Sequence, residues 1–135
     1  MSRTTLDDRD RELLSAVNFC HVSTLREDGT IHTVPIWVDV EGDLVVLNTE
    51  RDRAWPKNLR RTGHTTLTVL NHEDPYEYLT LTGHVAEETQ DGAREHIDAL
   101  AKKYIGQDAY PFHQDGDVRV IFRIAPDRVH RQQAG

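Results

Sequence analysis

The segment from Asn48 to Asn58 concentrates side chains that can bind an anion, at the point where a strand leads into a helix. Pro56 is tolerated only in the first turn of a helix, so a short helix is predicted to begin near Ala54. A helix N-terminus offers N–H groups and a favourable dipole to a phosphate, and arginine adds a planar pair of donors. The donors in this segment are Thr49, Arg51, Arg53 and Lys57. They predict a cradle for a cofactor phosphate; the alternative is a solvated helix start capped by Asp52.

A second candidate is the tripeptide Pro35-Ile36-Trp37. Proline removes one hydrogen bond from a strand, which favours an edge or a backbone exposed to a ligand. Trp37 either lines such a site or belongs to the core. Asn58 either bonds a cofactor or fixes its own turn. Arg60 and Arg61 are expected to be surface charges or partners of acidic side chains.

Other chemistries lack their motifs. The eight histidines show no metal-ligand spacing, so no metal site is predicted. No G-x-G-x-x-G or G-x-S-x-G element is present, which disfavours a Rossmann site and covalent hydrolysis. The single cysteine, Cys20, lies in an apolar context and is predicted to be a buried, inert thiol. His21 and His32 are expected to face each other across the first hairpin. No catalytic side chain is predicted; a histidine or tyrosine is the type to test as a general acid.

The bulk composition predicts one soluble domain over residues 1–135, with frayed ends at 1–6 and 131–135. Hydrophobic residues make up 37% of the chain and charged residues 29%. A net charge of -7 disfavours nucleic acid as a partner. The N-terminal segment lacks an apolar signal region and no stretch is long enough to span a membrane, so a cytoplasmic protein without membrane contact is expected.

The hydrophobic pattern predicts a mainly β fold with flanking helices. Helices are expected over 6–17, 54–61 and 89–104, and strands over 19–25, 31–40, 44–48, 65–71, 76–87 and 117–124. The first three strands are predicted to form an antiparallel meander, and the tail from Pro126 is predicted to be frayed. Gly83 indicates a bulge, a barrel corner or a close approach by another group. The aromatic segment 104–117 lines a pocket, reaches the partner subunit or covers the barrel end. Six antiparallel strands avoid open edges by closing into a small barrel, so a sizeable ligand is expected in an outer groove completed by a second subunit.

Four segments in this order resemble the flavin and deazaflavin split β-barrel family, which contains the pyridoxamine 5'-phosphate oxidase-like flavoproteins and the F420-dependent oxidoreductases. The resemblance covers about residues 8–130. The segments that carry it are FCHVSTLREDGTIHTVPIWVDVEGDLVVLNT, KNLRRTGHTTLTVLN, YEYLTLTGHVAE and RVIFRIAPDRVH. It implies a six-stranded antiparallel split β-barrel. The size, the NLRR helix and the arginine-rich composition look closer to the F420-using branch typical of actinobacteria.

This resemblance implies a function. The expected protein is a homodimer with a cofactor site at each subunit interface, and an F420-dependent oxidoreductase that transfers a hydride between coenzyme F420 and a small organic acceptor. One alternative is an FMN-dependent oxidase or reductase on the same fold. A second alternative is a non-catalytic carrier that binds F420 or haem.

The resemblance also implies which residues hold the cofactor. The tripeptide 35–37 matches the wall beside the flavin-like ring. Many family members carry a lysine three residues before the asparagine of NLRR; here that position is Trp55, and the lysine is Lys57. Arg53 or Arg51 is therefore expected to replace that lysine. The candidate cofactor-binding residues are Pro35, Ile36, Trp37, Asn48, Thr49, Arg51, Arg53, Lys57 and Asn58.

Overall fold

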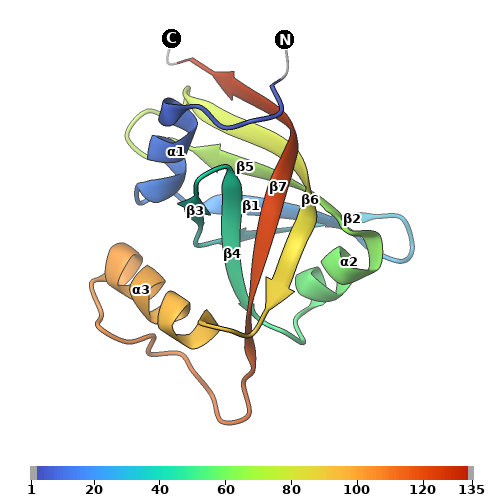
Figure 1. Cartoon of the computed structure of the whole chain (residues 1–135), viewed down its shortest axis with the longest axis vertical. Helices are drawn as coiled ribbons and strands as arrows, with labels where there is room; N and C mark the ends of the chain where they lie inside the picture. Colours follow the sequence, from blue (N-terminus) through green and yellow to red (C-terminus); the bar gives the residue numbers. More distant parts are fainter. Residues whose placement is uncertain (1–2, 134–135) are drawn as a thin grey trace.

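A computed structural model describes residues 3–133, in which three helices surround one seven-stranded antiparallel sheet (Figure 1). The helices are α1 (Asp8–Ser15), α2 (Ala54–Thr62) and α3 (Ala93–Ile105). The strands are β1 (Cys20–Leu25), β2 (Ile31–Ile36), β3 (Asp39–Glu41), β4 (Leu44–Glu50), β5 (His64–Leu70), β6 (Tyr78–Thr89) and β7 (Arg119–Gln132). None of these helices is both long and apolar enough to cross a membrane.

The sheet has the strand order β2-β1-β5-β6-β7-β4-β3, so β2 and β3 are its end strands. The prediction of a closed six-stranded barrel is wrong in two respects: there are seven strands in the described part of the chain, and the sheet is not closed. The expected strand 31–40 is divided at Trp37 and Val38. The physical reason is that α3 bonds the backbone of Val38 at this break. The hydroxyl of Tyr104 accepts from the Val38 N–H (3.2 Å), and Lys103 Nζ donates to the Val38 carbonyl (2.8 Å).

Of the predicted three-stranded meander, only the two hairpins are confirmed; the hairpins themselves do not pair with each other. β1 pairs with β2, and β3 pairs with β4, but the second neighbour of β1 is β5 and the second neighbour of β4 is β7. The two hairpins therefore lie at opposite ends of the sheet order. The expectation for the two histidines is also wrong: His21 lies opposite Pro35, and His32 lies opposite Thr24.

The last strand is much longer than predicted. β7 continues past Pro126 to Gln132, and Val129 in this extension is fully buried. The strand passes the proline because Pro126 pairs with Gly83, where the register between β6 and β7 shifts. Gly83 therefore lies at a sheet irregularity and also at a close approach, as predicted. A Cβ at this position would lie 2.6 Å from the carbonyl oxygen of Ala125. The helix predicted over 89–104 begins later, because β6 continues to Thr89.

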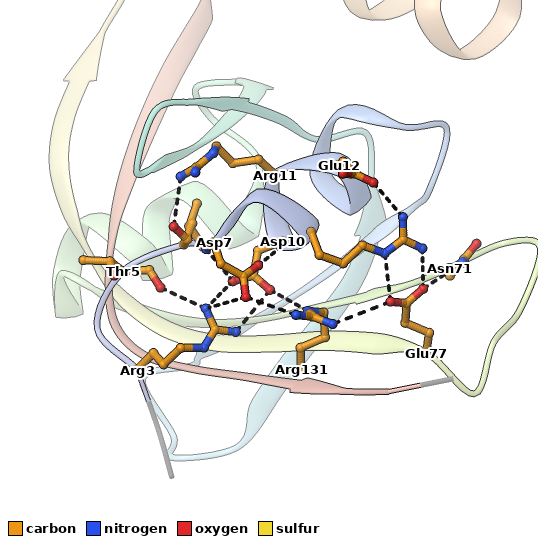
Figure 2. A network of polar contacts seen from close by, with 11 residues as sticks. Arg3, Thr5, Asp7, Asp10, Arg11, Glu12, Asn71, Glu77 and Arg131 are labelled. Atoms are coloured by element: carbon orange, nitrogen blue, oxygen red, sulfur yellow. Dashed lines mark hydrogen bonds and ion pairs between the residues drawn. The ribbon is translucent and has the colours of Figure 1, made fainter. Parts of the chain in front are cut away.

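The N-terminal segment is bound to the sheet rather than frayed in the part that the structure describes. Arg3 forms a bridge with Val129 in β7, and its guanidinium donates to Asp10 (2.6 Å), whose side chain is fully buried. Arg131 donates to the same carboxylate (3.1 Å), and Figure 2 shows how these arginines converge on it. The predicted frayed ends otherwise fall on residues 1–2 and 134–135, outside the described residues.

A single large core lies between the sheet and the helices. Its fully buried members include Leu13 of α1, Leu47 of β4, Leu59 of α2 and Phe122 of β7. Cys20 is also completely buried, and burial raises the pKa of its thiol to about 12, which confirms the predicted inert cysteine. In the view of Figure 1, α2 and α3 lie on either side of the lower ends of β4 and β7, where the chain leaves β4 for α2.

Candidate functional site

A pocket of about 180 Å³ opens where β4 ends and α2 begins. The link between β2 and β3, helix α3 and the loop before β7 form its other sides. Its lining residues are Phe19, Pro35, Ile36, Trp37, Asn48, Thr49, Arg53, Trp55, Ile97, Tyr110, Phe112 and Arg119. Six of the nine residues predicted to hold a cofactor are therefore brought together here, from two segments separated in the sequence.

Two guanidinium groups give the pocket its charge. Arg53 is exposed at the start of α2, and Arg119 is half-buried at the start of β7. Within residues 3–133, neither forms an ion pair with a carboxylate, and no carboxylate lines the pocket. Burial lowers the pKa of Arg119, with a further contribution from the nearby Arg53, although an arginine remains charged at neutral pH. A half-buried cation without a neutralising partner favours binding of an anion.

The start of α2 adds N–H groups to this charge. Arg53 is the N-cap residue, and no side chain caps the helix. The alternative with Asp52 as the cap is therefore wrong. The turn before the helix instead uses Glu50, whose carboxylate accepts the backbone N–H of Asp52 (2.9 Å). Since Pro56 has no N–H, the first helical donors are those of Ala54 and Trp55, and the helix dipole favours a negative charge beside them.

An aromatic wall forms another side of the pocket, and the Arg119 guanidinium lies over the Tyr110 ring, 5.0 Å from its centroid. Trp37 is partly buried and stacks on Tyr104, with 5.3 Å between ring centroids and an interplanar angle of 6°. Tyr110 meets Trp37 edge-on at 5.9 Å. The geometry of Trp37 fits the first predicted alternative, because this partly buried side chain lines the pocket and is not among the buried residues of the core. The hydroxyl of Tyr104 donates to the Asn18 carbonyl (2.5 Å), and burial raises the pKa of Tyr104 to about 12, so this anchor keeps its proton at neutral pH.

The polar residues of β4 serve the pocket indirectly. Asn48 is buried, its Nδ2 donates to the Ala93 carbonyl (2.8 Å), and its Oδ1 accepts from Arg119 Nε (2.9 Å). Thr49 is also buried and donates its hydroxyl to the Glu50 carbonyl (2.9 Å). Asn48 therefore holds the guanidinium in place and has little free capacity for a ligand.

Three predicted residues lie outside the pocket. Arg51 is exposed, and its Nε lies 3.6 Å from Asp52. Lys57 is exposed on another face of α2 from Trp55, which lines the pocket. Asn58 is buried, and its Nδ2 donates to Thr24 Oγ1 (3.2 Å), which ties α2 to β1. For Asn58 the geometry fits the structural alternative rather than a ligand role.

The two basic residues that follow Asn58 are engaged with the protein. Arg60 pairs with Glu88 at 2.6 Å, as expected for a partner of an acidic side chain. Arg61 donates to Asn58 Oδ1 (3.1 Å) and to the carbonyl of Leu25, so its partners are an amide and a backbone group.

Arg119 and several apolar lining residues were absent from the sequence prediction. Arg119 follows a loop and reads as a polar position on a half-exposed strand. Only the register of β7 on β4, which places Arg119 opposite Glu50, reveals its position. The sequence does point to Tyr110 and Phe112, because pocket lining is one of the roles predicted for the aromatic segment 104–117. Both lie in the pocket wall.

Comparison with known proteins places the fold among solved structures. A family profile described as pyridoxamine 5'-phosphate oxidase matches residues 6–133. An F420 reductase superposes with a TM-score of 0.80 at 22% identity, covering 95% of this chain and 100% of that chain. HupZ of Group A Streptococcus superposes with a TM-score of 0.68 at 16% identity, covering 96% of each chain. General Stress Protein 26 from Bacillus anthracis gives 0.66 at 14% identity, covering 92% and 91%. A comparison with curated proteins finds no match.

Proposed function

The chain belongs to the pyridoxamine 5'-phosphate oxidase family, and from that premise we propose that it is an oxidoreductase that binds coenzyme F420 in this pocket and transfers a hydride between the cofactor and an organic acceptor. One observation carries the proposal. Arg53 and Arg119 converge on an aromatic-walled pocket, and within residues 3–133 no acidic side chain neutralises them.

The lining residues fit a cofactor with an anionic part and a planar ring. In this proposal Arg53, Arg119 and the start of α2 bind the phosphate, since charge-assisted donors and a helix N-terminus are suited to that group. The ring lies beside Pro35, Ile36 and Trp37. Pro35 is exposed, which leaves room for a planar group against this segment.

Coenzyme F420 supplies the hydride chemistry when it is bound, and the protein contributes binding and orientation. None of the lining residues is a histidine, aspartate or glutamate, and Tyr110 is the lining residue of the type to be tested as a general acid. Asn48 has a positioning role, because it holds Arg119.

The pocket of one chain is small for the whole cofactor. Its volume of about 180 Å³ lies below the roughly 300–1,000 Å³ of typical small-molecule sites. The proposal therefore includes a homodimer in the cytoplasm, in which the second subunit completes the site. Light scattering of the purified protein tests this part, and a monomeric mass at micromolar concentration would contradict it.

FMN is the second candidate cofactor. Arg53 and the uncapped α2 form one compact anion site, which also suits a single phosphate. The same pocket could serve a carrier that binds F420 without turnover. The haem alternative has no supporting observation, because none of the lining residues is a histidine.

Fluorescence titration with F420, beside FMN at the same ionic strength, tests the proposal. We expect micromolar or tighter binding of F420 and weaker binding of FMN, followed by acceptor-dependent oxidation of reduced F420. Preference for FMN would transfer the assignment to the flavin cofactor. F420 binding without turnover over an acceptor panel would support the carrier, and binding of neither would reject the proposed function.

A further inference from the structure

A chain of polar contacts links the pocket to α3 and to the edge strand β3. Arg119 Nε donates to Asn48 Oδ1 (2.9 Å), and Asn48 Nδ2 lies 3.1 Å from His96 Nδ1. The other ring nitrogen, His96 Nε2, lies 3.2 Å from Asp39 Oδ2. These four side chains come from four different elements, and only Asn48 and Arg119 line the pocket.

The orientation of the Asn48 amide is determined by its neighbours. Its nitrogen must face the Ala93 carbonyl, 2.8 Å away, because a carbonyl oxygen can only accept. The amide oxygen then faces Arg119, which can only donate. The second hydrogen of the amide nitrogen points to His96, so Nδ1 of His96 must carry no proton.

The tautomer of His96 follows from this geometry. With Nδ1 as the acceptor, the ring proton lies on Nε2 and is donated to Asp39. Burial tends to raise the pKa of Asp39, but the hydrogen bonds from His96 and from the Val40 N–H outweigh it, and the pKa lies below its usual value. Asp39 therefore stays ionised and keeps the proton of His96 on Nε2.

We propose that His96 is a positioning residue of the pocket: its neutral ring holds Asn48 in the orientation that keeps the Arg119 guanidinium at the site, and protonation of His96 releases it. The imidazolium ion has an N–H at both nitrogens, so its Nδ1–H would oppose the N–H of Asn48. Rotation of the Asn48 amide by half a turn would not remove this conflict at lower cost. The Ala93 carbonyl would then face the amide oxygen, and Arg119 Nε would face the amide N–H₂ group, so both would lose their hydrogen bonds.

The sign of the effect separates this proposal from simple electrostatics. The charged groups around His96 are Asp39 on β3, Lys103 on α3, and Arg119 and Arg53 at the pocket. An added positive charge close to an anion site would by itself strengthen anion binding. If protonation of His96 instead releases the Arg119 guanidinium from the site, anion binding should become weaker at low pH. This consequence rests on the proposed function, since it assumes an anionic cofactor in the pocket.

The first test needs no ligand. The Nε–H signal of Arg119 in ¹⁵N NMR, assigned with Arg119→Lys, reports whether this group is held, and the ring signals of His96 report its protonation. We expect a protected Arg119 signal while the His96 ring signals show the neutral form, and loss of that signal when they show the protonated form. His96→Leu should lose the signal at both values.

His96→Asn is the decisive variant, because its Oδ1 can accept from Asn48 but cannot be protonated in this range. We expect a protected Arg119 signal throughout, and this variant keeps the test independent of whether His96→Leu folds. His84→Asn is the matched control: His84 pairs with Asp127 at 2.7 Å and does not line the pocket, so it should behave as the wild type. An Arg119 signal that is insensitive to pH and to both His96 variants would overturn the proposal.

The second test measures cofactor binding at about pH 8 and about pH 5 with F420 and FMN as probes. The phosphate monoester of FMN also titrates in this range, but it does so equally with every variant, so the comparison between proteins isolates His96. Relative to His96→Asn, the wild type should lose about tenfold in affinity at the lower pH, the effect of one charge-assisted hydrogen bond. Equal pH dependence of the two proteins would contradict a role in binding. If neither probe binds while the NMR result holds, the positioning role stands and the proposed function fails.

Discussion

At the scale of single residues, α2 offers a direct comparison between two cations. Arg53 and Lys57 lie four residues apart and are both exposed, but only Arg53 lines the pocket. Two residues four apart inside a helix would share a face, but Arg53 is the N-cap residue with an extended backbone, so its side chain does not follow the helical period. Lys57 lies two residues after Trp55, on another face of α2 from the pocket. Of these two cations, only Arg53 should therefore contribute to binding a phosphate at the start of α2.

Arg53→Ala should weaken F420 or FMN binding by about 10- to 100-fold, the loss of one charge-assisted hydrogen bond of roughly 1.5–3 kcal/mol. Lys57→Ala is the matched control and should bind as the wild type does. Isothermal titration gives the affinities, and the double variant should equal Arg53→Ala. The urea midpoints should barely change, since both groups are exposed. An equal loss with Lys57→Ala would show that the phosphate lies elsewhere.

At the scale of elements, the break between β2 and β3 is the feature that shapes the pocket. The hydroxyl of Tyr104 of α3 accepts from the Val38 N–H at the break and donates to the Asn18 carbonyl before β1, and its ring stacks on Trp37. The wall of the pocket is therefore positioned by a helix that follows it by more than fifty residues in the sequence.

Tyr104→Phe should destabilise the protein by about 1–3 kcal/mol, because the hydroxyl leaves the buried N–H of Val38 and the carbonyl of Asn18 without this partner. The ring and its stacking on Trp37 are retained. Urea unfolding measures the change. Tyr76→Phe is the control: Tyr76 is 79% exposed, and a change within about 0.5 kcal/mol is expected. Similar effects of the two substitutions would mean that the Tyr104 hydroxyl does not support the break.

The contact between β6 and β7 at Gly83 gives a second element-scale prediction. Gly83→Ala should destabilise by about 1–3 kcal/mol, because the added Cβ would lie 2.6 Å from the Ala125 carbonyl oxygen and from Ile124 Cγ2. Thr82→Ala, at the exposed neighbouring position, should cost less than about 1 kcal/mol. Thermal unfolding followed by circular dichroism compares the two. A smaller loss for Gly83→Ala than for Thr82→Ala would refute the close approach.

At the scale of the whole molecule, one ionic network joins the two ends of the described chain to the sheet (Figure 2). The carboxylate of Asp10 forms ion pairs with Arg3 and Arg131. The carboxylate of Glu77 accepts a hydrogen bond from Arg9 Nε at 2.9 Å. The hydrogen bond from Arg9 is the largest cause that lowers the pKa of Glu77 to about 2. This network makes stability depend on pH.

A carboxylate with a lowered pKa in the folded state stabilises the protein fully above its unfolded pKa. For Glu77 that contribution should be lost as the pH falls from about 4.5 toward about 2, because over this range the unfolded state binds a proton at Glu77 and the folded state does not. The urea midpoint of the wild type should fall over this range. Glu77→Gln should be less stable at neutral pH and show a shallower acid dependence, whereas the exposed Glu73→Gln should follow the wild type. Parallel curves for wild type and Glu77→Gln would exclude Glu77 as a source of the acid sensitivity.

Short stretches of the sequence determined the mainly β fold class and pointed to two of the segments that line the candidate pocket. Alternating apolar residues predicted the β elements, and Pro56 with Gly63 predicted α2 almost to its ends, because turn chemistry and periodicity act over a few residues. The segments 35–37 and 48–53 were identified for the same reason, since each carries its donors or its proline in one short run.

Only the tertiary structure decided the remaining features of the sheet and of the candidate pocket. Arg119 reaches the pocket through the register of β7 on β4. The strand predicted over 31–40 is divided at Trp37 and Val38, where α3 bonds the backbone, and Lys57 lies outside the pocket that Arg53 lines. Each of these depends on pairing between segments far apart in the chain. Such pairing follows from the packing of the whole core, and no short stretch of residues contains it.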